Sequence, residues 1–334
     1  MLMRKFFSQI LLFTALFLFP FAAYNYVTDY SGVLKDDFSY LRIEPNQHIV
    51  KMRYLTQNID KYNAFAFGNS RVGKIDLLKI NDGCRWYNMT YSEGLPAEWL
   101  ADVKILLKRG VKIKRLFIGV DEGSFRTDPK SHETQFLRMP YREHEDLLVD
   151  LKYLLRIPSP FVTAEVFEEQ KGFFDMYGTG RPLGEWVDER IEANIEKHIN
   201  DPKFNVPYVA AGGYRVDATI AELKELKDLA DSAGIETFFC FLPVHQLTYR
   251  NADKNTLFDF KRKLAAVTDY YDFSGINKIT TNNYFYFETS HFRPLVGDMI
   301  TARIFGGAQD DFGVLVTRGN VDEHIKKQLD ELKE

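Results

Sequence analysis

The sequence has few cysteines and none of the common motifs that hold a metal ion. Only Cys84 and Cys240 occur among 334 residues, and no Cys-x-x-Cys or His-Glu-x-x-His motif is present. A protein-bound zinc ion needs clustered thiolates and imidazoles, so we expect neither a metal nor another cofactor. Both cysteines fall within predicted strands and are expected to be free thiols. An inter-strand disulfide stays open as the alternative, because spacing alone does not decide pairing.

The chain also lacks a basic tract. Its 43 Lys and Arg residues are balanced by 47 Asp and Glu residues, which leaves a formal net charge of −4 at pH 7. Nucleic-acid binding requires Lys and Arg side chains that cluster against phosphates, so we do not expect a nucleic-acid partner. The glycines at 178 and 180 are not followed by a phosphate-loop lysine, which argues against a nucleotide site of that type.

What the sequence does contain is a long apolar run near its N-terminus. Residues 6–27 are mostly apolar and follow Arg4 and Lys5. About 20 apolar residues are enough to cross the hydrocarbon core of a bilayer. A cleaved signal peptide would have a shorter apolar stretch and a small residue where Phe21 stands, so an uncleaved single-pass anchor is favoured. The positive charges before the run place the N-terminus in the cytoplasm and the remaining chain outside it.

Strand and helix patterns alternate through most of the remaining sequence. Short apolar runs predict five strands, at 64–67, 84–89, 115–120, 236–242 and 270–273. Helical spacing of apolar residues, with proline at two first helical positions, predicts helices at 72–80, 96–109, 217–234, 253–267 and 294–304. This alternation is typical of an α/β fold with a mostly parallel five-stranded sheet covered on both faces, a three-layer α/β/α arrangement.

The predicted elements also divide the chain into parts. These are a cytoplasmic tip and transmembrane anchor at 1–30, a stalk at 31–60, an α/β domain at 61–306 with an inserted cap at about 122–213, and a C-terminal extension at 307–334. The cap is predicted because its sequence breaks the alternation and has helical patterns of its own at 143–155 and 185–199. Apolar residues at helical spacing over 321–332 predict an amphipathic helix in the extension.

Residues suited to nucleophilic acyl chemistry lie at both ends of the α/β domain. Ser70 follows the first predicted strand, and His291 lies just before the last domain helix with Glu288 three residues ahead of it. A serine hydroxyl becomes a nucleophile when an imidazole accepts its proton and an acid holds that imidazole in the right tautomer. We therefore expect Ser70, His291 and Glu288 to be nucleophile, base and acid. The alternative is that Ser70 only caps the helix after its turn.

Further polar residues are predicted at the same edge of the sheet, because ligands bind at the carboxyl ends of parallel strands. Arg71 follows Ser70, Asp121 follows the third strand and His245 follows the fourth. We treat these three as candidate substrate-binding residues, and His245 also as an alternative base. Asp272, at the end of the fifth strand, is the alternative acid, although a capping role there is favoured.

The blocks Phe67-Gly68-Asn69-Ser70-Arg71 and Glu288-Thr289-Ser290-His291-Phe292-Arg293-Pro294 resemble the Gly-Asp-Ser and Asp-x-x-His motifs of the SGNH/GDSL hydrolase superfamily. They are most similar to its membrane-anchored bacterial members linked to the cell envelope. The resemblance covers about 60–125 and 215–306 and leaves the inserted cap unmatched. It implies a flavodoxin-like fold with the serine as nucleophile and the histidine as base. A glutamate stands at the acid position, one methylene longer than the usual aspartate.

The resemblance also implies an oxyanion hole. In the superfamily its donors are the backbone N–H of the nucleophile, a glycine after the second strand and an asparagine after the third. Here these correspond to Ser70 and Gly94, while the third position is Asp121. An ionised carboxylate has no hydrogen to donate, so Asn88 is the alternative third donor.

The activity implied by the resemblance is that of a serine esterase or O-acyltransferase, with acetyl as the expected acyl group. The expected substrate is an envelope or extracellular polysaccharide, and a membrane protein that delivers the acyl group is an expected partner. The implied location is the bacterial inner membrane, with the catalytic domain in the periplasm or outside the cell. A non-catalytic assembly or binding protein of an envelope-polysaccharide system is the alternative, which Asp121 and Glu288 keep open.

Overall fold

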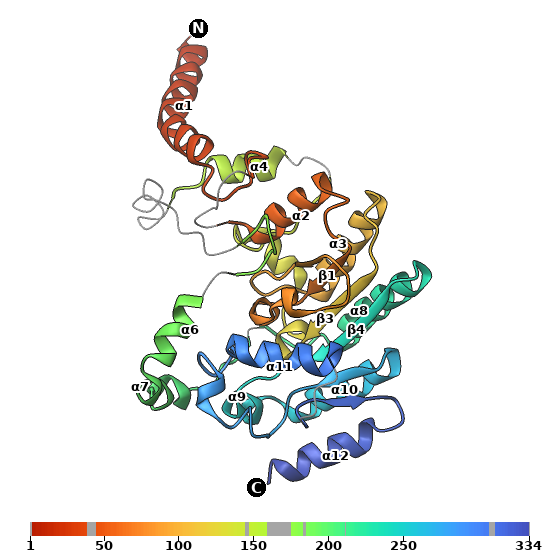
Figure 1. Ribbon diagram of the computed structural model, residues 1–334. Helices are drawn as coiled ribbons and strands as arrows, with labels where there is room; N and C mark the ends of the chain where they lie inside the picture. Colours follow the sequence, from red (N-terminus) through yellow and green to blue (C-terminus); the bar gives the residue numbers. More distant parts are fainter. Residues whose placement is uncertain are drawn as a thin grey trace.

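The computed structural model describes residues 2–38, 45–143, 147–158, 175–182, 185–210, 212–306 and 311–333. Parts of the predicted stalk, cap and C-terminal extension, at 39–44, 144–146, 159–174, 183–184, 211 and 307–310, lie outside the described residues. Figure 1 shows an α/β body from which the helix α1 (Leu2–Thr28) projects at the N-terminal end.

One mixed sheet forms the centre of this body, with the strand order β2-β1-β3-β4-β5-β6. The strands are β1 (Ala64–Phe67), β2 (Trp86–Asn88), β3 (Arg115–Val120), β4 (Glu236–Phe241), β5 (Tyr270–Asp272) and β6 (Val314–Val316). The first five strands pair in parallel, and β6 pairs with β5 in the antiparallel direction. The order of the parallel strands is that of flavodoxin-like sheets.

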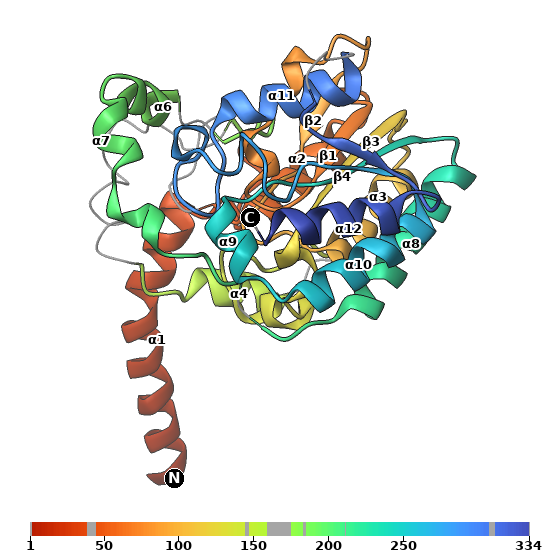
Figure 2. The same ribbon diagram turned by 90° about the horizontal axis from the view of Figure 1, so that it is seen from below.

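The two faces of the sheet bury separate hydrophobic clusters, because successive side chains of a strand point to opposite faces. In β1, Phe65 and Phe67 join one cluster, whereas Ala64 and Ala66 join the other. The larger cluster packs the sheet against α3 (Pro96–Lys108), α8 (Val216–Ser232), α10 (Lys254–Val267) and α12 (Val321–Glu331). The smaller cluster includes α11 (Pro294–Phe305), and Figure 2 shows α11 on the side of the strands opposite α10 and α12.

The sheet has six strands, so the prediction of five is corrected by one. β6 is a three-residue edge strand in the C-terminal extension, and two of its residues, Val314 and Leu315, are exposed. A run of three residues is too short to be separated from a loop by periodicity. β6 pairs with β5, and the following helix α12 buries Val321 and Ile325 in the larger cluster.

The predicted helix at 72–80 is also replaced by other structure. Two short 3-10 helices occur there, η1 (Val72–Lys74) and η2 (Leu77–Lys79). Asp76 lies between them, and its carboxylate accepts a hydrogen bond from the backbone N–H of Leu78. Aspartate competes with helix continuation by bonding to nearby backbone groups, which explains the break.

The segment predicted as a stalk contains α2 (Gln47–Gln57), and the buried side chains of Met52, Tyr54 and Leu55 join the larger cluster. The described part of the predicted cap contains several short helices. They are η3 (Glu122–Phe125), η4 (Pro129–Thr134), α4 (Leu147–Leu154), α6 (Glu185–Glu192), α7 (Ile195–Ile199) and η5 (Pro202–Asn205). After β4 come α9 (Gln246–Asn251) and η6 (Asn283–Phe285).

Among the described residues, α1 is the one helix long and apolar enough to cross a membrane or to serve as a signal anchor. Large apolar side chains along it, such as Leu11 and Phe13, are exposed. Cys84 and Cys240 are both free thiols, and Cys240 is fully buried.

Candidate active site

The site lies at the carboxyl ends of β1 and β3, in the centre of the sheet. The chain leaves β1 toward β2 on one side, and β3 continues the sheet on the other side. This reversal of strand order is the switch point at which open α/β sheets bind ligands. Ser70 stands three residues after the end of β1, and Asp121 directly follows β3.

Glycines allow the backbone segments to approach one another closely here. A Cβ atom added to Gly68 would lie 2.2 Å from Cγ2 of Val72, and one added to Gly94 would lie 2.6 Å from the carbonyl oxygen of Gly68. Both separations are below van der Waals contact, so a larger residue would move the turn that carries Ser70. The loop that follows β2 therefore packs directly on the turn after β1.

The structure brings Ser70, His291 and Glu288 into one hydrogen-bonded chain. The Oγ of Ser70 is 2.7 Å from Nε2 of His291, although the two residues are 221 positions apart in sequence. The other ring nitrogen, Nδ1, is hydrogen-bonded to Oε1 of Glu288. The extra methylene of glutamate therefore does not prevent the carboxylate from reaching the imidazole. This order of groups is that of a nucleophile, its base and the acid that orients the base.

The carboxylate of Glu288 is held in place by its own loop. The backbone N–H of Ser290 donates to Oε2 at 2.6 Å, and that of His291 donates to Oε1 at 2.9 Å. Burial acts to raise the pKa of Glu288, but the hydrogen bonds from the His291 ring and from these two N–H groups outweigh it and lower that pKa. Glu288 is therefore ionised at neutral pH, as an acceptor for an imidazole N–H must be.

Two cavities are both lined by Ser70 and His291. The larger has a volume of about 300 Å³ and is lined by Ser70, His291 and Glu288 together with Gln47, Lys74, Thr90, Tyr91, Ser92, Pro182 and Phe287. Its walls are mostly apolar, and Nζ of Lys74 lies 4.9 Å from the centre of the Phe287 ring. The smaller cavity, about 40 Å³, contains Ser70, His291 and Gly94 among its lining residues. A reacting group bound between them would contact both the hydroxyl and the imidazole.

Of the predicted oxyanion donors, Gly94 lies in the smaller cavity with Ser70, and its N–H has only a long hydrogen bond of 3.3 Å to Tyr91. The preceding residue, Glu93, has a φ of +58°, a strained conformation for a non-glycine residue. An ion pair of 2.8 Å between Glu93 and Arg138 holds that turn.

Asn88 does not face the site, and its predicted role is corrected. Its side chain is fully buried, with Nδ2 donating to the Val72 carbonyl at 3.0 Å and Oδ1 accepting from the Thr90 N–H at 2.9 Å. Both ends of the amide are engaged in joining β2 to the turn after β1. Asn88 is therefore a structural residue, and the third donor expected from the resemblance has no counterpart at position 88.

Arg71 and Asp121 form a buried ion pair that ties three segments together. The guanidinium donates to Oδ2 of Asp121 at 2.6 Å, to the Ser290 carbonyl at 2.7 Å and to the Ser290 hydroxyl at 2.6 Å. The side chain of Asn69 donates to the same carboxylate oxygen at 2.6 Å. The pair thus connects the nucleophile turn, the end of β3 and the histidine loop. These contacts indicate a positioning role for both residues. Arg71 also lines the smaller cavity, and the substrate-binding role stays a prediction.

We expect the substitution Arg71→Met to reduce the free energy of unfolding by about 3–5 kcal/mol, because it leaves the buried Asp121 carboxylate without its counter-ion. Urea denaturation of the full chain in detergent measures this change. The exposed ion pair between Arg262 and Asp322 supplies the matched control, and Arg262→Met is expected to cost about 1 kcal/mol or less. Equal losses in the two variants would contradict the positioning role of Arg71.

His245 does not line either cavity beside Ser70 and is held by other contacts. Its Nε2 is 2.9 Å from Oδ1 of Asn283, and its Nδ1 accepts from the N–H of Leu247 at the start of α9. Burial lowers the pKa of His245, which favours a neutral ring that acts as a helix cap. The predicted roles in substrate binding or as an alternative base are therefore replaced by a structural one.

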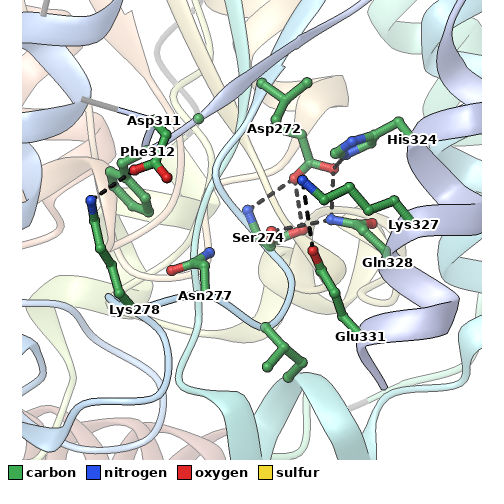
Figure 3. A pocket seen from close by; sticks show the side chains of 13 residues that line it. Asp272, Ser274, Asn277, Lys278, Asp311, Phe312, His324, Lys327, Gln328 and Glu331 are labelled. Atoms are coloured by element: carbon green, nitrogen blue, oxygen red, sulfur yellow. Dashed lines mark hydrogen bonds and ion pairs between the residues drawn. The ribbon is translucent and has the colours of Figure 1, made fainter. Parts of the chain in front are cut away.

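Asp272 belongs to a different pocket, shown in Figure 3. Its carboxylate pairs with the buried Nζ of Lys261 at 2.7 Å and with Nε2 of His324 at 2.9 Å, and it accepts two hydrogen bonds from Ser274. Burial acts to raise the pKa of Asp272, but Lys261 and His324 outweigh it and lower that pKa. The acid at the end of β5 thus fastens α10 and α12 to the sheet, and the carboxylate that contacts the His291 ring is that of Glu288.

A second buried cluster of hydrogen-bonded side chains borders the site, and no pattern in the sequence predicts it. The Tyr91 hydroxyl, in the wall of the larger cavity, donates to Glu98 at 2.7 Å, and the same carboxylate contacts Nδ1 of His132 at 2.7 Å. Burial acts to lower the pKa of His132, but the nearby carboxylates of Glu93 and Glu98 outweigh it and raise that pKa to about 9. His132 is therefore an imidazolium at neutral pH, and it fastens the loop that carries Gly94 to α3 and η4.

In comparisons with known proteins, no model of a protein family matches the chain. No curated protein matches it at a significant level either.

Proposed function

We propose that the protein is an SGNH-like serine esterase or O-acyltransferase, with the three-layer architecture of that superfamily. The observation that carries this proposal is the continuous contact from the Ser70 hydroxyl through both nitrogens of the His291 ring to Glu288. Such a chain of groups activates a hydroxyl for attack on an acyl carbon. It lies at the switch point of the sheet and opens into a cavity of about 300 Å³.

In the proposed mechanism, Oγ of Ser70 attacks the carbonyl carbon of an ester while Nε2 of His291 accepts the hydroxyl proton. Glu288 accepts the N–H of Nδ1 and stabilises the imidazolium that forms. The backbone N–H groups of Ser70 and Gly94 face the developing oxyanion, each contributing about 3 kcal/mol to the transition state. The imidazolium then protonates the leaving alcohol, and an acyl-enzyme remains on Ser70.

The second half of the reaction reverses these steps. His291 removes a proton from water or from a sugar hydroxyl, whose oxygen attacks the acyl carbon and releases Ser70. Hydrolysis and transfer differ only in which hydroxyl reaches the acyl-enzyme, so exclusion of water from the cavity decides between them. The Phe287 ring and the adjacent Lys74 in the cavity wall supply an apolar surface and a cation for a sugar substrate.

The proposed substrate is an acetylated or acetyl-accepting polysaccharide of the bacterial envelope. Under this proposal α1 anchors the protein in the inner membrane with the catalytic domain on the periplasmic or extracellular side. A membrane protein that supplies acyl groups is the proposed partner of a transferase. The length and apolar character of α1 support the anchor.

The proposal is tested with the purified full chain in detergent, using an acetyl ester of a chromogenic phenol as donor. We expect release of the phenol, and release of acetate or formation of an acetylated oligosaccharide when a polysaccharide fragment is added. Accumulation of acetylated sugar in place of acetate identifies a transferase. A folded protein that gives neither phenol release nor an acyl-enzyme contradicts the proposal.

The alternative is a non-catalytic binding protein that keeps this fold. It is favoured by two observations. Asn88 is engaged in structural hydrogen bonds, and Asp121 stands where the superfamily has an amide donor. Tight binding of a polysaccharide fragment without turnover would support this alternative.

A further inference from the structure

The helix α4 is apolar on two opposite sides, one buried against the protein and one exposed. Val149 and Tyr153 lie one helical turn apart and pack inward against a small cluster that includes Val33, Ile49 and Met139. On the opposite side Leu147, Leu148 and Leu151 point outward, with side chains that are 71%, 69% and 39% exposed. Residues at this spacing share one face of a helix. Together the three leucines form an exposed apolar stripe on this two-turn helix, a feature typical of a surface that binds another apolar phase.

The position of α4 identifies that partner. The Nδ2 of Asn25, near the end of α1, donates to the carbonyl oxygens of Leu154 and Arg156 at 2.8 and 2.7 Å. Figure 1 shows α4 lying across the end of α1, at the side of the body from which α1 projects. The apolar stripe therefore begins where the apolar helix α1 ends.

The residues around this junction have the composition of a membrane interface. In the last turns of α1 the Tyr26 side chain is 56% exposed, and Nζ of Lys35 lies 4.9 Å from the centre of its ring. On α4, Lys152 is exposed beside the apolar stripe. Tyrosine and lysine side chains concentrate at the level of lipid headgroups, where an apolar body and a polar end are both satisfied.

We propose that α4 lies in the surface of the bilayer that α1 spans, with Leu147, Leu148 and Leu151 among the lipid chains. This inference rests on the proposed membrane location of α1 and adds a second contact with lipid. The protein body covers the inward side of α4, so the exposed leucines are the apolar side that can enter the interface, as in helices that lie parallel to the membrane plane. Two contacts, one across the bilayer and one along it, fix the tilt of the domain.

The same helix is connected to the candidate active site. The Tyr153 hydroxyl accepts a hydrogen bond of 2.8 Å from Nδ2 of Asn46, and the next residue, Gln47, lines the larger cavity. Asn46 also caps α2, since its Oδ1 accepts from the N–H of Ile49 at 2.9 Å. Contact of α4 with lipid therefore sets the position of the cavity relative to the membrane surface.

The experiment uses the full chain with Cys84→Ser and Cys240→Ala, reconstituted in vesicles of phosphatidylethanolamine and phosphatidylglycerol. A single environment-sensitive NBD label is attached through Leu148→Cys or Leu151→Cys. Leu12→Cys serves as the reference inside α1. Leu78→Cys is the matched control, because it is a leucine 72% exposed on η2, which contacts α11. Quenching by nitroxide-bearing lipids and by aqueous iodide is measured for each label, and thermal unfolding verifies that each variant is folded.

We expect lipid nitroxides to quench the labels at 148 and 151 at least about threefold more than the label at 78, with iodide giving the reverse order. Iodide quenching at 148 and 151 equal to that at 78 would overturn the inference. Protection of both labels from iodide and from lipid would show that protein covers the stripe, which also overturns it. If the label at 12 is not quenched by lipid, α1 itself is outside the bilayer and the membrane location fails as well.

Discussion

Replacing Ser70 with alanine is expected to reduce kcat for ester turnover on the order of 10⁶-fold. The substitution removes the atom that would form the acyl-enzyme and leaves His291 without the hydroxyl it contacts at 2.7 Å. The cavity walls stay in place, so the KM of any residual reaction should change little. Steady-state kinetics on the chromogenic acetyl ester measure both constants.

The control for this substitution is Ser232→Ala, which removes an exposed hydroxyl at the end of α8. This variant should keep the activity of the original protein. A Ser70→Ala variant that hydrolyses the ester within tenfold of the original rate would show that another group carries the reaction.

Replacing Glu288 with glutamine is expected to reduce kcat by about 10⁴-fold. An amide that presents its NH₂ group to Nδ1 would favour the ring tautomer with the hydrogen on Nε2, which cannot accept the Ser70 proton. An amide also lacks the charge that stabilises the imidazolium. The measurement is kcat for the same ester, with circular dichroism to confirm an unchanged fold.

Glu323→Gln is the control for the removal of one carboxylate, since Glu323 is exposed on α12. We expect it to leave kcat unchanged. The kcat of Glu288→Asp should lie between those of Glu288→Gln and Glu323→Gln. Aspartate keeps the negative charge, but its side chain is one methylene shorter. A Glu288→Gln variant as active as the control would remove Glu288 from the catalytic chain.

The sequence predicts the central strands well because they are short, apolar and fully buried. β3 occupies the predicted residues 115–120, and β1 the predicted residues 64–67. The juxtaposition of Ser70 with His291 is also predicted, since both positions fall at the carboxyl edge of a parallel sheet. The edge strand β6 could not be predicted, because it is only three residues long and pairs with β5, about 40 residues earlier in the chain.

The polar groups around the catalytic chain are harder to predict, because their roles depend on contacts between distant segments. Their positions in the sequence make Arg71 and Asp121 candidate substrate-binding residues. In the structure they form an ion pair with each other, and Arg71 also donates a hydrogen bond to the histidine loop. The sequence likewise predicts His245 and Asn88 at the carboxyl edge of the sheet. In the structure their side chains form hydrogen bonds with neighbouring segments of the protein. A single sequence predicts at which strand end a side chain lies, but it does not predict which group that side chain hydrogen-bonds to.

The central claim is that the Ser70 hydroxyl is an activated nucleophile, and reaction with a fluorophosphonate tests it most directly. Phosphorus bonds covalently to an oxygen that has lost its proton to a base, and fluoride leaves. After digestion of the labelled full chain, mass spectrometry locates the adduct. We predict a single adduct on the peptide that contains Ser70, absent from Ser70→Ala and slowed in Glu288→Gln. A folded protein that stays unlabelled, or an adduct on another residue, would contradict the account.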